Sequence, residues 1–160
     1  MFNGKKQDAV NLHQNFMIHA LKLAEMAYDK GEVPIGAIVV KDGRMIGKGH
    51  NQTEMLKDPT AHAEMLAISS ACATLNNKYL KGCTLYVTLE PCPMCAGAIV
   101  WSKIDRIVFG ALDEKNGACG SIFNIASNKL LNHRPEVIHG ILELDSELLL
   151  KKFFADKRNS

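Results

Sequence analysis

The chain has 160 residues, of which 47% are hydrophobic and 22% are charged. That length predicts one domain large enough to build its own core, and the composition excludes disordered, collagen-like and low-complexity chains. The net charge of +2 is too small for a basic coat over the whole surface, but it allows a local basic patch that binds a compact RNA.

The sequence favours a soluble protein of the cytoplasm with no membrane partner. The longest apolar run, residues 96–101, is far shorter than the roughly 18 residues of a membrane span. The polar first residues lack the apolar core of a secretory signal. Five cysteines are an odd number, so a complete disulfide framework is not expected, and clustered cysteines then indicate metal binding or catalysis.

The first half of the chain predicts a helix, a hairpin and a second helix. Residues 1–11 are polar and we expect them to be frayed. Apolar residues then recur at helical spacing over 16–27, and this helix should stop at Gly31. The next predicted elements are a buried strand at 35–40, a hairpin turn at Asp42-Gly43, a return strand opening at Met45-Ile46, a polar loop over 51–59 and a helix over 61–75 capped by Thr60.

Strands and helices continue to alternate in the second half. Pro91 is expected to open a helix over 92–102, because proline suits the first turn of a helix. The other predicted elements are strands at 84–89, 106–109 and 136–142, a glycine-rich loop over 110–121 and a C-terminal helix over 144–158. No repeat or linker divides the chain, so the alternation predicts a single domain, residues 1–160, built as an α/β sandwich around one mixed sheet.

Two short segments contain the residue types that bind zinc. His62-Ala63-Glu64 lies at the start of one predicted helix, and a segment with Cys92 and Cys95 lies at the start of another. Cysteines at i and i+3 present both sulfurs to one side, and the positive end of a helix dipole favours thiolates. Because zinc prefers thiolate and imidazole, His62, Cys92 and Cys95 are candidate zinc ligands.

Three protein ligands would leave a position for water, as in a catalytic zinc site. Cys83 starts the strand that ends beside Cys92, and six residues of strand separate the two by about 20 Å. Cys72 lies about 15 Å along the helix that follows His62. Both are too far away to complete the site, whereas Cys119 and His50 stay open as a fourth ligand.

Glu64 is the candidate base beside this zinc. Zinc with two thiolates and a neutral imidazole is formally neutral, so it acidifies its water less than a site with three imidazoles, and a neighbouring base would help to take the proton. Positions two apart in a helix point to nearly opposite faces. The assignment therefore requires His62 to lie outside the regular helix, as the first residue at a helix start can.

Each of these features has a simpler explanation when taken alone. A CxxC pair can be a redox motif or two unused thiols, a lone histidine is more often a cap or core residue, and a lone glutamate in a first helical turn more often complements the helix dipole. In combination, H-x-E followed by P-C-x-x-C is the signature of zinc nucleobase deaminases.

With these motifs the chain resembles the cytidine deaminase-like superfamily, and within it the bacterial tRNA-specific adenosine deaminases. The resemblance covers residues 16–158, and it implies a three-layer α/β/α sandwich around a mixed, roughly five-stranded sheet. The stretches that carry it are 32–37, 58–64, 84–98, 108–111, Asp113, Lys115, 117–118, 120–121, 132–134 and the pair Phe153-Phe154. The chain departs from many relatives at Trp101, Leu112 and Ala155, where histidine or basic residues are common.

The resemblance implies hydrolytic deamination of adenosine to inosine at the wobble position, position 34, of tRNA, with tRNA-Arg of anticodon ACG as the expected substrate. One zinc per subunit, held by His62, Cys92 and Cys95, would activate a water that attacks C6 of adenine. Glu64 would carry the proton from this water to the ring nitrogen and then to the departing amine. A homodimer in which both subunits grip the anticodon loop is also implied.

The resemblance also implies a set of substrate contacts. Aromatic side chains can stack on single-stranded bases, and lysines can meet phosphates. The implied contacts are Asn51 to the flipped base, Val33 in the base pocket, Ala63 to the substrate, Asp113 and Lys115 to the sugar and backbone, and Phe153 and Phe154 to loop bases. Lys151, Lys152, Lys157 and Arg158 lie close together on the same predicted helix and are candidates for phosphate contacts. A turn asparagine, ordinary core residues and a solvated charged surface are the structural alternatives.

Two other functions stay open. A free-base or nucleoside deaminase of the same superfamily, acting on guanine, cytosine or cytidine, would carry the same zinc motif, although the 110–121 loop and the basic C-terminal helix favour RNA. A binding module with a structural zinc would need a fourth protein ligand and would not need Glu64.

Overall fold

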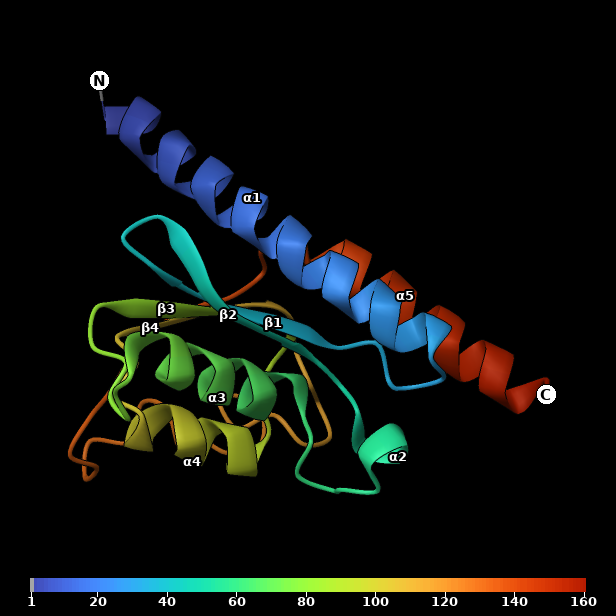
Figure 1. Ribbon diagram of the computed structural model, residues 1–160. Coiled ribbons are helices and arrows are strands. Elements are labelled where there is room, and N and C mark those ends of the chain that lie inside the picture. Colours follow the sequence, from blue (N-terminus) through green and yellow to red (C-terminus); the bar gives the residue numbers. More distant parts are fainter. Residues whose placement is uncertain (1) are drawn as a thin grey trace.

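Helices and strands alternate along the chain in the computed structural model, which describes residues 2–160 (Figure 1). The elements are α1 (Phe2–Asp29), β1 (Gly36–Lys41), β2 (Arg44–His50), α2 (Thr53–Leu56), α3 (Ala63–Leu75), β3 (Cys83–Leu89), α4 (Pro93–Trp101), β4 (Arg106–Ala111), β5 (Glu136–Ile138) and α5 (Glu143–Arg158). The strands form one sheet in the order β2-β1-β3-β4-β5. β1 is antiparallel to β2 and β3, whereas β3, β4 and β5 are parallel, so the sheet is mixed.

Different helices cover the two faces of the sheet: α1 and α5 lie on one face, α3 and α4 on the other (Figure 1). Along β1, Ala37 and Val39 belong to the core that includes α3, while Ile38 and Val40 belong to the core that includes α1. Successive side chains of a strand point to opposite faces, so a strand covered on both faces reads as a continuous apolar run. The three-layer α/β/α sandwich around a five-stranded mixed sheet is therefore confirmed.

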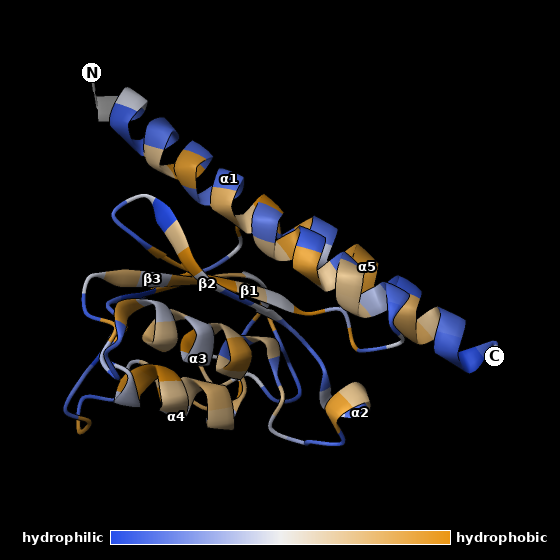
Figure 2. Ribbon diagram, viewed as in Figure 1, coloured by the Kyte–Doolittle hydropathy of each residue, from blue (hydrophilic) through white to orange (hydrophobic). Residues whose placement is uncertain are grey.

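The hydropathy of the residues differs between the two helical layers. Figure 2 shows mostly apolar residues along α3 and α4, whereas the N-terminal turns of α1 and the C-terminal turns of α5 are mostly hydrophilic. Within residues 2–160, no helix is long and apolar enough to cross a membrane.

Close packing of α3 on β2 fixes the start of α3. A Cβ atom at Gly47 would lie 2.5 Å from the carbonyl oxygen of Ala67, and one at Gly49 would lie 2.6 Å from the carbonyl oxygen of Ala63. Glycine on the strand and alanine on the helix therefore let the two backbones approach. This contact holds the first turn of α3, and with it His62, near the end of β2.

The first helix is longer than expected. Residues 2–11 are part of α1, so the expectation that residues 1–11 are frayed is wrong for the part of this segment that the structure describes. The side chains of residues 3–12 are exposed, and no packing holds them. Helix propagation costs little once a helix is nucleated, and no proline interrupts the pattern before Pro34, so the turns continue outward from the packed part of α1.

The two helices that carry the candidate ligands begin later than expected. Thr60 does not cap α3, because its hydroxyl donates a hydrogen bond to Asp58 Oδ1 at 2.7 Å and His62 takes the N-cap position. Pro91 does not open α4 either: Pro93 occupies the first turn, and Cys92 before it is the N-cap. A residue that precedes proline is held in an extended conformation, and this keeps Cys92 outside the helix.

The last strand is shorter than expected and the last helix is as expected. β5 pairs with β4 only at 136–138 rather than over 136–142. Gly140 then adopts a positive φ of 83°, and its N–H donates to the carbonyl oxygen of Gly110, so the chain turns away from the sheet edge. α5 follows at Glu143–Arg158, close to the predicted C-terminal helix.

Candidate active site

Three side chains of metal-binding type converge where α3 and α4 begin. His62 is the N-cap of α3, Cys92 is the N-cap of α4, and Cys95 lies in the first turn of α4. His62 Nδ1 lies 3.6 Å from the Sγ atom of Cys92 and 3.6 Å from that of Cys95, and the three atoms all lie within 4.8 Å of one another. The fold thus brings together the three residues predicted to bind zinc.

The chemistry at the start of α4 favours a thiolate at Cys92. Hydrogen bonding from Cys95, with a further contribution from His62, lowers the pKa of Cys92 to about 4. The positive end of the α4 dipole acts in the same direction. A thiolate is the form that a metal binds, so Cys92 is ready to act as a ligand at neutral pH.

Glu64 lies buried beside this cluster. Its side chain is 4% exposed, and burial raises the pKa of its carboxyl group. Within residues 2–160, Oε1 of Glu64 is a buried side-chain oxygen with no hydrogen-bond partner. Buried polar atoms are normally paired, so an unpaired carboxylate oxygen beside three ligand atoms fits a site that receives a water or a substrate atom.

The backbone of His62 explains how His62 and Glu64 reach the same site. His62 has φ −76° and ψ 152°, an extended conformation, and regular helix begins only at Ala63. The side chain of His62 therefore follows the geometry of an extended chain, whereas that of Glu64 follows the geometry of a helix, so the two need not point to opposite faces. The requirement that His62 lie outside the regular helix is confirmed.

The donor set fits a zinc ion with an open position. In the part of the chain that the structure describes, the cluster contains His62, Cys92 and Cys95 and no fourth histidine, cysteine or carboxylate. His50 and Cys119, which the sequence left open, are not part of it. One imidazole and two thiolates suit zinc, and three protein ligands are typical of catalytic zinc rather than structural zinc.

Comparisons with known proteins identify the family. Residues 10–111 match the family described as the cytidine and deoxycytidylate deaminase zinc-binding region. The chain is 56% identical over 145 residues to a tRNA-specific adenosine deaminase of Aquifex aeolicus (strain VF5), which covers 91% of this chain and 95% of that relative. The chain belongs to the zinc deaminases, in the family of tRNA-specific adenosine deaminases.

Solved structures support the same assignment for this deaminase. One, from a study of A-to-I editing by tRNA:A34 deaminases at the wobble position of transfer RNA, matches with a TM-score of 0.82 and 46% identity, covering 85% of this chain and 99% of that chain. A guanine deaminase from Nitrosomonas europaea matches with a TM-score of 0.77 and 28% identity, covering 87% of this chain and 82% of that chain. The predicted fold, zinc cofactor and deaminase class are confirmed.

A cavity of about 950 Å³ leads to the metal site of the deaminase. Its walls come from the 33–35 and 51–53 segments, the end of β3, the starts of α3 and α4, the 112–116 loop and one side of α5. The lining residues are Val33, Ile35, Asn51, Thr53, His62, Glu64, Leu89, Glu90, Cys92, Pro93, Leu112, Asp113, Glu114, Lys115, Asn116, Glu143, Glu147, Leu150, Lys151 and Phe154.

Val33, Asn51 and Ala63 are predicted to contact the substrate, and two of these three residues line this cavity. Val33 and Asn51 both do, and Asn51 Oδ1 accepts a hydrogen bond of 2.9 Å from the backbone N–H of Ala63. Ala63 itself does not line the cavity, because its side chain is fully buried in the core against the sheet. The N–H of Ala63 thus holds Asn51 in place and its methyl group packs in the core, while contact of Ala63 with substrate stays a prediction.

The 112–116 loop places Asp113 and Lys115 in the cavity wall, and their contacts to the sugar and backbone of a nucleotide stay predictions. A buried carboxylate, Glu90, holds the loop: its oxygens accept hydrogen bonds from the backbone N–H groups of Asp113, Cys119 and Ser121, all at 3.1 Å. The hydroxyl of Ser121 donates to Glu90 as well, at 2.5 Å. Because four donors surround it, the Glu90 carboxylate is fully satisfied and the loop is fixed to the end of β3.

The two phenylalanines of α5 face different surroundings. Phe154 is 46% exposed and lines the cavity, whereas Phe153 is 6% exposed and packs edge-on against Tyr28 of α1, with ring centroids 5.8 Å apart. Adjacent residues of a helix point about 100° apart, so both rings cannot face the cavity. The prediction that Phe153 stacks on RNA bases is corrected, because Phe153 holds α5 to α1.

A second hollow, of about 540 Å³, adjoins the cavity along α5. It shares Lys115, Leu150, Lys151 and Phe154 with the cavity and adds Lys157 and Arg158. The outer part of the site is therefore basic and carries one exposed aromatic ring.

Sequence reasoning gave no role to two buried acids, each 2% exposed: Glu90 in the cavity wall, and Glu32 directly before the lining residue Val33. One signal was available: Glu90 directly follows an apolar strand and precedes the cysteine motif, where a buried charge must be hydrogen-bonded. No such signal in the sequence indicates that Glu143, Glu147 and Leu150 line the cavity, because their place depends on how α5 packs on the rest of the fold.

Proposed function

We propose that this deaminase converts adenosine to inosine at the wobble position, position 34, of a tRNA anticodon, with tRNA-Arg of anticodon ACG as its first substrate. The observation that carries the proposal is the unpartnered buried oxygen of Glu64 beside His62, Cys92 and Cys95 at the cavity. The 56% identity to a tRNA-specific adenosine deaminase favours a tRNA adenosine as the group that enters.

His62, Cys92 and Cys95 would hold the zinc. When bound, zinc supplies Lewis acidity that lowers the pKa of a water molecule. Glu64 accepts a proton from the water as the water oxygen forms its bond to C6 of adenine. Glu64 then delivers this proton to N1 of the ring, takes the second proton of the former water and gives it to the amino group. The C6–N bond breaks and ammonia leaves, so that adenosine and water become inosine and ammonia.

The remaining lining residues suit a flipped nucleotide. The oxygen of the Asn51 side chain is used by the Ala63 N–H, so the amide NH₂ is the group available to a ring nitrogen of the base. Val33 supplies an apolar wall, and Asp113 and Lys115, which also line the cavity, suit contacts to a ribose and a phosphate. Phe154 offers a ring for stacking on a neighbouring base, and the basic hollow along α5 suits phosphates.

A homodimer and a cytoplasmic location stay predictions. Large exposed apolar side chains such as Trp101 and Leu130, 80% and 92% exposed, are consistent with a surface that a second copy covers. Sedimentation of the protein with and without an anticodon stem-loop tests the dimer.

The competing function is deamination of a free base, as the guanine deaminase of Nitrosomonas europaea performs. The substrate panel that separates the two consists of an anticodon stem-loop with adenosine at the wobble position and the free compounds adenosine, cytidine, cytosine and guanine. Mass spectrometry should find inosine at the wobble position alone. Turnover of free guanine or cytidine without wobble inosine would reject the RNA assignment.

A further inference from the structure

The end of α1 places one acidic side chain inside the molecule. α1 ends in a helix-terminating turn in which Gly31 has φ +77°, the Gly31 N–H bonds to the carbonyl oxygen of Tyr28, and the Glu32 N–H bonds to that of Ala27. This hydrogen-bond pattern is a Schellman motif, and it reverses the chain direction directly before Glu32. Glu32 is left 2% exposed, although a glutamate after a helix is usually solvated.

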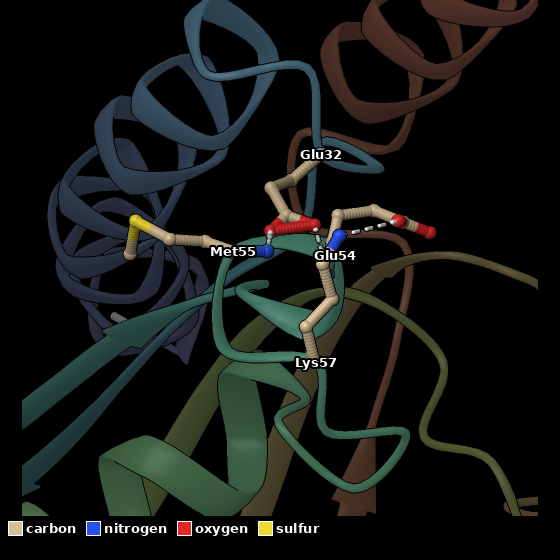
Figure 3. Close-up of polar contacts among 4 residues, drawn as sticks. All are labelled: Glu32, Glu54, Met55 and Lys57. Atoms are coloured by element: carbon tan, nitrogen blue, oxygen red, sulfur yellow. Dashed lines mark hydrogen bonds and ion pairs between the residues drawn. The ribbon is translucent and has the colours of Figure 1, made fainter.

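Glu32 caps a helix that is distant in the sequence. Its Oε1 accepts a hydrogen bond of 2.8 Å from the backbone N–H of Glu54, and its Oε2 accepts one of 3.2 Å from the N–H of Met55 (Figure 3). These N–H groups lie in the first turn of α2, where a local N-cap side chain would normally accept them. Gln52, the N-cap of α2, makes no such bond, so Glu32 replaces it.

The N–H of the N-cap Gln52 donates to the carbonyl oxygen of Ala61 at 3.0 Å, but within α2 itself Glu32 is the side chain from outside that the described contacts place on the first turn. The helix has only four residues and buries none of them. The ion pair between Lys57 and Glu54, also drawn in Figure 3, spans 4.0 Å between side chains that are 83% and 78% exposed, and exposed pairs of this kind contribute little. The carboxylate of Glu32 is thus the main anchor of the first turn of α2.

The anchored segment is a wall of the cavity. Val33, which follows Glu32, and Thr53, which precedes Glu54, both line the cavity, as does Asn51. The N–H of Asn51 bonds to the carbonyl oxygen of Ile35 at 3.1 Å, so the two segments joined by Glu32 also meet at the cavity. Glu32 does not line the cavity itself and touches no metal ligand among the described contacts.

We propose that Glu32 is a positioning residue that sets substrate binding: it fixes the 51–55 segment so that Asn51 and Thr53 present a fixed wall to the base. The proposal rests on the deaminase function proposed above. It makes Glu32 act on recognition of the nucleotide and not on zinc binding or proton transfer, which belong to α3 and α4.

The variant Glu32→Gln tests this, because glutamine keeps the size but offers one acceptor where two N–H groups point. Its matched control is Glu54→Gln, which removes an exposed charge from the same helix. Deuterium exchange should become faster in a peptide covering 51–57 in Glu32→Gln and not in the control. With the wobble-adenosine stem-loop as substrate, the KM of Glu32→Gln should rise about tenfold, because substrate binding is weakened. Its kcat should stay within about threefold of that of the unmodified protein, and its zinc content should be full.

Glu32→Asp is a second variant. Because aspartate keeps both acceptor oxygens, its KM should lie between that of Glu32→Gln and that of the unmodified protein. An unchanged KM with unchanged exchange in Glu32→Gln would overturn the proposal. So would a parallel loss of zinc, kcat and thermal stability in Glu32→Gln and Glu32→Asp, because that pattern indicates a structural role only. If the unmodified protein makes no wobble inosine at all, the proposed function fails, and the exchange measurement still decides whether Glu32 anchors the segment.

Discussion

The side chain of Asn51 accepts a hydrogen bond of 2.9 Å from the backbone N–H of Ala63, the residue between the candidate zinc ligand His62 and the candidate proton carrier Glu64. The first backbone donor of α3 is thereby satisfied by a residue of the cavity wall. One bond thus couples the wall that meets the base to the helix start that carries the chemistry.

This coupling predicts different results for two substitutions at Asn51. Asn51→Asp keeps an oxygen acceptor for the Ala63 N–H but loses the amide donor, so it should retain zinc and stability while deamination falls about 100-fold or more. Asn51→Ala leaves the Ala63 N–H without a partner and should also lower the free energy of unfolding by about 1–3 kcal/mol. Urea unfolding, zinc content and deamination rate together separate the two effects. Equal activity of Asn51→Asp and the unmodified protein would exclude the amide as a base contact.

Gly117 is predicted to be required beside Glu90. A Cβ atom at Gly117 would overlap the Glu90 carboxylate, so Gly117→Ala should destabilise the protein by about 1–3 kcal/mol and disorder the 112–121 loop. Gly97→Ala is the matched control, because a Cβ there meets nothing within 4 Å and alanine is the better helix residue in α4. Thermal unfolding of both variants checks this, and equal stability would show that the Glu90 anchor can shift at no cost.

The pair Phe153 and Phe154 predicts a separation of stability from RNA binding. Phe153→Ala should cost about 3–5 kcal/mol of stability, because it empties a buried site between α1 and α5. Phe154→Ala should change stability by less than about 0.5 kcal/mol and weaken stem-loop binding by about 1–3 kcal/mol per stacked base. Fluorescence anisotropy with a labelled stem-loop measures the binding. Unchanged affinity in Phe154→Ala would remove the stacking role.

His13 predicts a dependence of stability on pH. Its side chain is 8% exposed and its Nδ1 lies 2.8 Å from the hydroxyl of Tyr86. Burial lowers the pKa of His13 below 6.5, Arg106 lowers it further, and Glu136 opposes them. Between 6.5 and this lower folded-state pKa the unfolded chain binds more protons than the folded chain, so stability falls as the pH falls through that window.

The variant His13→Gln should make the free energy of unfolding depend less steeply on pH. Urea unfolding at pH values above and below 6.5 gives the slope for both proteins. The same slope in His13→Gln and the unmodified protein would assign the pH dependence to other groups.

Local patterns predicted the elements and the ligand set well, because hydrophobic period and ligand spacing are local properties. His62, Cys92 and Cys95 converge as their positions at two helix starts predict. The ends of elements were less predictable: Thr60 bonds to Asp58 instead of capping α3, and Pro93 rather than Pro91 starts α4. Where a helix begins depends on which of several neighbouring residues, one or two positions apart, takes the capping position.

Long-range relationships were beyond the sequence. The rings at 153 and 154 are chemically identical, and only the docking of α5 on Tyr28 decides which one is buried. In the same way, nothing near Glu32 in the sequence indicates that its partners are the N–H groups of Glu54 and Met55.

The proton-carrying role of Glu64 on wobble adenosine is the central claim, and one measurement tests it most directly. Zinc-loaded Glu64→Ala and Glu64→Gln are incubated with the wobble-adenosine stem-loop, with Glu25→Gln on the exposed side of α1 as control. Both Glu64 variants should keep one zinc per subunit and form inosine slower by a factor of about 10²–10⁴, whereas the control should match the unmodified protein. Inosine formation at the unmodified rate in either Glu64 variant, or loss of zinc along with activity in both, would contradict the account.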